Sequence, residues 1–159
     1  MTYSEQILEE LVKLASRKTV VIDVNGSQYE VGPDVYQASV NGASRTLDYT
    51  YAKTSAYEAM LRGALHFMNI DKLDLLVLGL PVSIYDGEEI GSFLKNKYTG
   101  RIEITPGSFI EIADVWILPQ PSGGMFYYGS TNETYARIDG KNNLLIDPGY
   151  YTLDWYATE

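Results

Sequence analysis

The sequence predicts an α/β protein, a single domain in which helices flank a mixed β-sheet. An apolar helical stripe is followed by the largely apolar run 73–80, and this order is typical of an α/β crossover. Two further segments, on either side of Pro106-Gly107, alternate in polarity like paired strands. The chain has 159 residues and no segment that resembles a linker, so we expect one domain.

Composition excludes several classes of protein. The chain is 45% hydrophobic and 21% charged, as in ordinary soluble globular proteins. A net charge of −9 argues against direct binding of nucleic acid, which requires many Lys and Arg residues. No run of about 20 apolar residues exists to span a membrane, and we expect no secretory signal, because no basic segment followed by an apolar run opens the sequence. Without cysteines, disulfides and thiol nucleophiles are excluded, and we expect a cytoplasmic protein.

The first 18 residues predict an amphipathic helix that precedes the domain 19–159. Thr2 and Glu5 fit a capping box, in which each side chain satisfies a free amide of the first turn. The apolar stripe could pack on the domain or on a partner. It consists of Ile7, Leu8, Leu11, Leu14 and Ala15.

A hairpin and a second helix follow. Asn25-Gly26 separates 20–24 from 27–31 and favours a type I′ turn between two strands. Residues 34–53 show no clean period and predict a long loop. Ser55 and Glu58 form a second candidate capping box, which begins a helix that ends near residue 69. Its expected apolar face is made by Tyr57, Met60, Leu61, Ala64, Leu65 and Met68.

The remaining elements alternate between strands and helices. The run 73–80 reads as a strand buried on both faces, and a short helix is expected over 87–97. Strands are predicted over 101–105 and 108–118, then a short helical or irregular piece over 125–135 and a final hairpin over 144–156. The only histidine, His66, has helical spacing and predicts a core or helix-surface side chain rather than a catalytic base.

The turn of the final hairpin carries the residues best suited to chemistry. A phosphate site needs a glycine, whose backbone amide can approach closely, and a hydroxyl donor; Gly149 and Thr152 meet these needs. Hydrated Mg²⁺ is bound through one or two carboxylates, and Asp147 and Asp154 could supply them. The alternative is an ordinary hairpin in which Asp147 caps backbone amides.

Three segments together resemble a known family. They are Gly79-Leu80-Pro81-Val82, the strand that ends in Pro119-Gln120-Pro121, and Asp147-x-Gly149-x-x-Thr152-x-Asp154. In this order and spacing they resemble the ParM/StbA plasmid-segregation proteins of the actin, Hsp70 and ribonuclease-H-like superfamily. The resemblance covers about residues 19–157, which correspond to the first half of a full-length member.

This resemblance implies a filament-forming ATPase with ATP and Mg²⁺ as its ligands. Asp147 would hold magnesium through a water molecule, and Gly149 and Thr152 would cradle the β- and γ-phosphates. Tyr150 and Asp154 belong to the same nucleotide-binding turn. Gln120 matches the position of the family's residue that orients the attacking water, a role that depends on positioning.

The sequence also departs from the family. The family's first phosphate loop has no counterpart, because Asp23-Val24-Asn25-Gly26 lacks the lysine that should follow. Tyr150 and Tyr151 stand where many members have small residues. We therefore expect this chain alone to bind ATP weakly or not at all and not to hydrolyse it.

Two other functions and two arrangements of the last hairpin remain open. The chain could be a non-enzymatic module that binds an actin-like filament or self-associates, or a small tyrosine-rich ligand-binding domain. The hairpin 144–156 could fold back into the place of the missing first hairpin and complete a ribonuclease-H-like sheet. It could also be exchanged between two chains.

Overall fold

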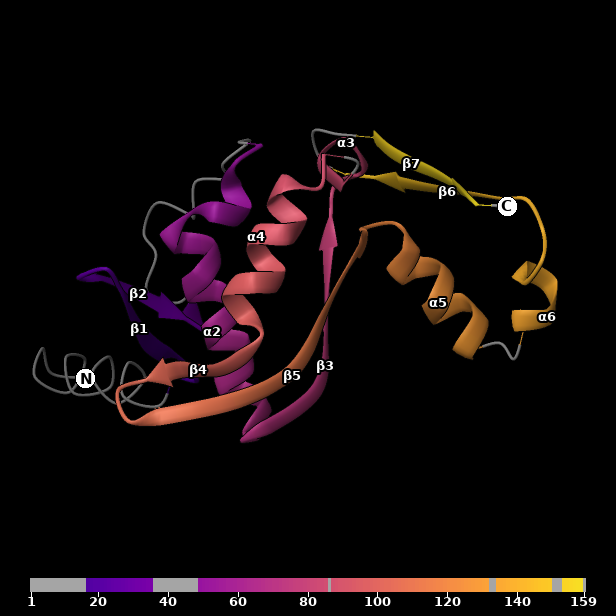
Figure 1. Ribbon diagram of the computed structural model, residues 1–159. Helices are drawn as coiled ribbons and strands as arrows, with labels where there is room; N and C mark the ends of the chain where they lie inside the picture. Colours follow the sequence, from indigo (N-terminus) through magenta and orange to yellow (C-terminus); the bar gives the residue numbers. More distant parts are fainter. Residues whose placement is uncertain (1–16, 36–48, 86, 132–133, 150–152, 159) are drawn as a thin grey trace, which may run out of the picture. The chain divides into compact units, whose positions relative to one another are not determined.

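The computed structural model describes residues 17–35, 49–85, 87–131, 134–149 and 153–158 (Figure 1). Most of the predicted helix 1–18 and most of the loop 34–53 lie outside these residues. The chain divides into two compact units, each described by itself below. The first unit comprises 1–71 and 103–110, and the second comprises 72–102 and 111–159.

The first unit begins with the predicted hairpin. Strands β1 (Val20–Val24) and β2 (Ser27–Val31) pair antiparallel. Asn25 has φ 54° and Gly26 has φ 80°, the positive angles of a type I′ turn. The amide of Gly26 donates to Asp23 Oδ1 at 3.0 Å, which closes the turn. The Asn-Gly prediction is confirmed.

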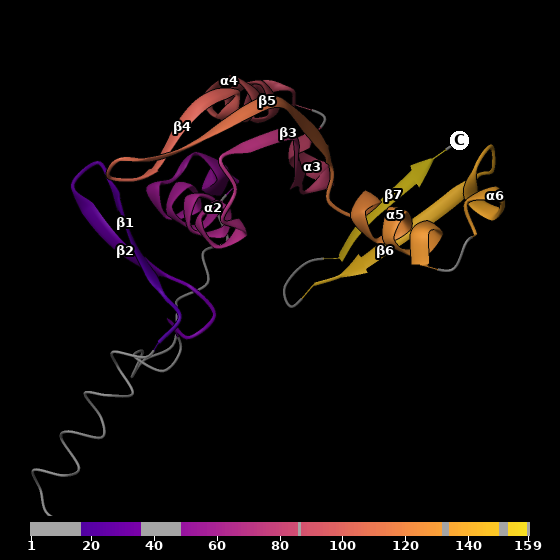
Figure 2. The same cartoon turned by 90° about the horizontal axis from the view of Figure 1, so that it is seen from below.

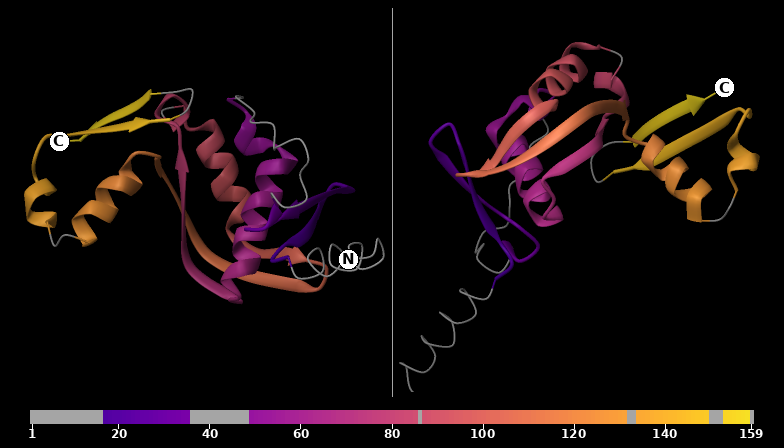
Figure 3. Two further views of the ribbon diagram at one scale, coloured as in Figure 1. Left: turned by 180° about the vertical axis from the view of Figure 1, so that it is seen from behind. Right: turned by 60° about the horizontal axis from the view of Figure 1, so that its bottom comes forward.

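Helix α2 (Ser55–Met68) packs on this hairpin, after the short 3₁₀ helix η2 (Tyr51–Lys53) (Figure 3). Ile22 and Val24 from β1 and Ala59 from α2 form a buried core, surrounded by partly buried residues of both strands. Small residues bring helix and hairpin close together. A Cβ atom built on Gly63 would lie 2.5 Å from Val31 Cγ1.

The expected apolar face of α2 is only partly correct. Leu65 is buried, but Met60 is 57% and Met68 50% exposed. The helix instead turns Ala59 and Gly63 toward the hairpin, because only small residues permit this close contact. The helix is thus rotated about its axis relative to the face that hydrophobicity alone predicts.

The expected cap of α2 is displaced by one residue. Thr54, with extended ψ 156°, is the N-cap, and its hydroxyl oxygen accepts a hydrogen bond from the Tyr57 amide at 3.2 Å. Ser55 is the first helical residue. Glu58 forms an ion pair with Arg62 at 3.5 Å, one turn further along the helix.

We expect Thr54→Ala to lower the free energy of unfolding by about 1 kcal/mol, because it removes the acceptor of a first-turn amide. Ser55→Ala is the matched control and should change stability by less than about 0.5 kcal/mol. Urea unfolding of the full chain followed by circular dichroism measures both. An equal loss in the two variants would contradict the assignment of the cap.

A three-stranded sheet has the strand order β3-β5-β4. Strands β3 (Lys72–Leu80) and β5 (Ser108–Pro119) pair parallel. Strand β4 (Gly100–Thr105) neighbours β5 and joins it through the two residues Pro106 and Gly107, which makes a hairpin. The short helix α3 (Val82–Tyr85) and helix α4 (Glu89–Tyr98) lie between β3 and β4 in the chain. The prediction of a mixed α/β fold is confirmed.

Strand β3 is not buried on both faces as expected. Leu76, Leu78 and Leu80 are buried, whereas Leu75 is 37% and Val77 49% exposed. Helix α4 packs on the buried face, where Gly91 comes within van der Waals distance of Ile117 (Figure 1). A largely apolar run therefore conceals alternating burial, because successive side chains point to opposite faces.

The last elements are α5 (Ser122–Thr131), α6 (Tyr135–Ile138), β6 (Asn143–Pro148) and β7 (Leu153–Thr158). The predicted final hairpin is confirmed, and α5 lies beside β6 (Figure 2). The fold-back into the three-stranded sheet is not found, because β6 and β7 pair with each other in a sheet of their own. Among the described residues, no helix is long and apolar enough to cross a membrane.

Candidate functional site

Gln120 lies directly after β5, at the carboxyl end of the two parallel strands. Its backbone amide donates to the Leu80 carbonyl at 2.7 Å, which extends the pairing of β3 with β5. The backbone of Gly79 lies close to Gln120, since a Cβ atom built on Gly79 would be 3.3 Å from Gln120 Cα. The segment Gly79-Leu80-Pro81 thus fixes the backbone of Gln120 at this end of the sheet.

Asp147 and Asp154 are direct cross-strand partners in the β6–β7 hairpin. Both are half-buried and lie on the same face of the hairpin as Leu145 and Tyr156, the next such pair. Side chains directly opposite each other have Cβ atoms about 4.5–5.5 Å apart, and two like charges at that distance repel. A cation between the two carboxylates would relieve this repulsion.

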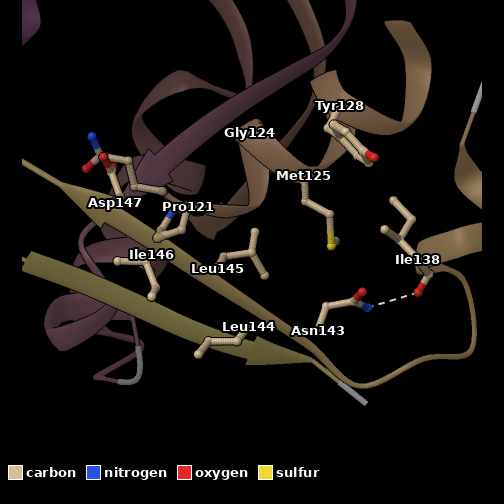
Figure 4. Close-up of a pocket in the computed structure, with 11 residues that line it drawn as sticks. Pro121, Gly124, Met125, Tyr128, Ile138, Asn143, Leu144, Leu145, Ile146 and Asp147 are labelled. Carbon is tan, nitrogen blue, oxygen red and sulfur yellow. Dashed lines mark hydrogen bonds between the residues drawn. The ribbon is translucent and has the colours of Figure 1, made fainter. Parts of the chain in front are cut away.

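Gln120 and Asp147 line one cavity of about 430 Å³ within the second unit (Figure 4). This volume is within the usual range for small-molecule sites. In Figure 4, Asp147 and Pro121 lie toward one end of the cavity, and Asn143 and Ile138 lie at the other. The structure therefore brings together two predicted residues that are 27 positions apart in the sequence (147 − 120).

The middle of the cavity has an apolar wall that sequence reasoning missed. Met125 and Tyr128 from α5 and Leu145 from β6 line it, and Met125 points toward Leu145 (Figure 4). Met125 and Tyr128 are three residues apart, so their shared helix face was a detectable signal. Asn143 had no such signal; its Nδ2 donates to the Ile138 carbonyl at 2.9 Å and joins the α6 end to β6.

The other predicted site residues are not brought into this cavity. Gly149 is exposed, and neither it nor Asp154 is among the described lining residues. Tyr150 and Thr152 lie outside the described residues, so their predicted roles stay predictions. His66 is an exposed residue of α2 whose ring meets Phe67 edge to face at 5.4 Å, in agreement with the expected helix-surface position. Within the described part of the chain, no group of three or more His, Cys, Asp or Glu side chains could hold a metal ion.

A mixed α/β sheet with a polar side chain beyond the carboxyl end of its parallel strands defines a class of proteins that bind ligands at that end. A family model described as "Actin like proteins N terminal domain" matches residues 3–123 of the chain. Because the match covers most of the chain, the protein belongs to this family of actin-like proteins. Gln120 lies inside the matched region, whereas Asp147 and Asp154 lie beyond it. The comparisons with curated proteins and with solved structures gave no match.

Proposed function

We propose that the chain is part of a cytoplasmic actin-like ATPase of the ParM/StbA plasmid-segregation type, nucleotide-dependent and filament-forming when complete. The observation that carries this proposal is the convergence of Gln120 and Asp147 on one cavity. Gln120 follows the parallel strands and Asp147 is in the terminal hairpin, so the two come from separate elements. This is the arrangement that the resemblance implies for a water-orienting amide and a magnesium-binding carboxylate.

The chemistry of the facing pair Asp147 and Asp154 supports Mg²⁺, and with it ATP, as the proposed ligands. Mg²⁺ prefers carboxylates, waters and phosphate oxygens, and Asp147 and Asp154 supply two carboxylates at directly opposite positions of the hairpin. Bound Mg²⁺ would neutralise phosphate charge. In this proposal Asp147 holds the ion through water, while Gly149, Tyr150 and Thr152 contact the phosphates. Gln120 would orient a water molecule by donating and accepting hydrogen bonds through its amide.

This chain on its own is proposed to bind nucleotide weakly and not to hydrolyse it. The pattern Asp-x-Gly-x-x-Thr-x-Asp of the proposed phosphate-binding turn occurs once in the sequence. Phosphoryl transfer depends on positioning the phosphates between several donors and a metal ion. A single turn supplies only some of these donors. The binding of ATP is therefore a sharper test of the proposed site than the hydrolysis of ATP.

Calorimetric titration of the chain with Mg-ATP tests this proposal. We expect weak binding to the unaltered chain and about tenfold weaker binding to Asp147→Asn, because the change removes one charge from the proposed ion site. Asp74→Asn is the matched control, since the Asp74 side chain is 92% exposed at the start of β3. Equal affinity of all three chains would contradict the assigned role of Asp147.

A second function is favoured by one further observation. One face of the hairpin exposes Leu144, Ile146, Leu153 and Trp155, each between 59% and 64%. Contiguous exposed apolar residues mark interaction sites. A non-enzymatic module that binds an actin-like filament or self-associates is therefore the alternative, and no ATP binding at millimolar concentration would favour it.

A further inference from the structure

Along the second half of β5, one edge of the strand is not paired with any described strand. Strand β5 has 12 residues and β4 has 6, and the two are joined by a two-residue turn. In a hairpin with so short a loop, β4 can pair with only about the first six residues of β5. Strand β3 covers the opposite edge as far as Pro119. Because the Gln120 amide donates toward β3, alternation along the strand places the backbone groups of Val115 and Ile117 at this open edge. The Val115 amide is already bound by Asp114 Oδ1, which leaves the Ile117 amide and both carbonyls for another strand.

A groove of about 560 Å³ runs beside this edge. Its lining includes the four consecutive residues 115–118 and, from α4, Gly91, Ser92 and Lys95. Consecutive side chains of a strand point to opposite faces, so a groove that touches all four lies along the edge of the strand. An unpaired edge beside free space is a template for another strand.

Charges of opposite sign lie toward the two ends of the groove. Lys95 Nζ is 3.2 Å from Asp114 Oδ1, and Glu88, exposed at the start of α4, lines the groove together with Leu118. Helix α4 runs antiparallel to β5, which places Glu88 toward the later residues of the strand. Trp116 is between these ends and is 53% exposed.

The orientation of Trp116 is fixed by Asp114. Its indole Nε1 donates to Asp114 Oδ2 at 2.9 Å, and the Val115 amide donates to the other carboxylate oxygen at 2.8 Å. These hydrogen bonds, first of all that of the indole, hold the pKa of Asp114 below its ordinary value. The carboxylate therefore stays charged at neutral pH and keeps Lys95 at its end of the groove.

We propose that two copies of the chain pair antiparallel along residues 114–118 of β5, about a two-fold axis at Trp116. Such an interface is isologous, so each contact occurs twice. Antiparallel pairing places Glu88 of each copy near the partner's Lys95. The Lys95 ammonium group can then form an ion pair with this Glu88 and keep its ion pair with Asp114 of its own chain. It also places the two Trp116 side chains opposite each other, a favourable cross-strand pair. The two three-stranded sheets then become one continuous sheet.

This groove differs from the cavity of Gln120 and Asp147 in its lining residues, so the pairing does not depend on nucleotide. A strand pair of this length buries less than a standard interface, and each chain carries a net charge of −9. We therefore expect a weak, reversible dimer with a Kd on the order of micromolar.

Sedimentation equilibrium of charge variants tests the pairing. Glu88→Lys and Lys95→Glu should each weaken self-association at least about tenfold, because each places like charges across the interface. An equimolar mixture of the two variants should restore association, since both contacts become attractive in the mixed dimer. Lys141→Glu, an exposed change outside the groove, is the control and should leave association unchanged.

Oxidative cross-linking provides a second measurement. The chain has no cysteine, so Trp116→Cys introduces a single thiol at the proposed two-fold axis. It should form a covalent dimer rapidly, whereas Val21→Cys, an equally exposed position in β1, should not. A monomer at every concentration would overturn the proposal, as would a mixture that does not restore association. A dimer that is insensitive to both charge changes would also overturn it and would point to exchange of the β6–β7 hairpin.

Discussion

Replacing Gly63 by alanine is expected to destabilise the first unit by about 3 kcal/mol, because the new methyl group has no space to occupy. Its carbon would lie 2.5 Å from Val31 Cγ1 and 2.8 Å from Val31 Cβ. Both positions are in regular structure, so neither can move without separating α2 from β2. Hydrogen exchange of the β1 and β2 amides in the full chain measures the loss.

Two further variants distinguish this clash from a general effect of losing glycine. Val31→Ala in the Gly63→Ala background should recover part of the stability, because it removes the methyl group that is struck. Gly124→Ala, in α5, meets nothing within 4 Å and should be neutral or stabilising by up to about 1 kcal/mol. A Gly63→Ala chain as stable as the unaltered chain would contradict the close packing.

Arg62→Ala is expected to lower the free energy of unfolding by about 3 kcal/mol, since it removes several charge-assisted hydrogen bonds at once. Arg62 Nε and Nη2 donate to the Ile104 carbonyl at 3.1 and 2.9 Å, and Nη1 donates to the Asp23 carbonyl at 2.9 Å. The side chain is only 13% exposed. One residue of α2 thus joins the helix to the end of β1 and to β4.

Arg62→Lys separates the geometry of these bonds from their charge. Lysine keeps the charge but lacks the planar fork, so it should restore less than half of the lost stability. Arg137→Ala, an exposed change in α6, is the control and should stay within about 0.5 kcal/mol. Chemical denaturation of the full chain followed by circular dichroism compares the three variants. Equal stability of Arg62→Ala and Arg137→Ala would show that the three carbonyl contacts contribute nothing.

The hairpins and strands were predictable because their signals are local. Asn25-Gly26 and Pro106-Gly107 each supply the backbone angles that a tight turn needs, so the flanking strands followed. The faces of the elements were less predictable. The stripe of α2 was misjudged at Met60 and Met68, because the close approach of the hairpin, and not hydrophobicity, selects the buried side.

The candidate site was predictable only through its separate residues. The resemblance to actin-like proteins pointed to Gln120 and Asp147, and both line one cavity. The apolar wall of Met125, Tyr128 and Leu145 was not predicted, since it depends on how α5 lies beside β6. The open edge of β5 was also not predicted, because the part of β5 that pairs with β4 depends on which strands become neighbours in the sheet.

By itself, the sequence determined the α/β class, the order of the elements and the acidic pair Asp147 and Asp154 at the last turn. These features depend on residues a few positions apart, where backbone preference and periodicity act directly. Only the tertiary structure decided that the last hairpin forms its own sheet, that α2 buries its small residues, and that Gln120 and Asp147 line one cavity. Each depends on close packing between segments distant in sequence, and no local pattern specifies such packing.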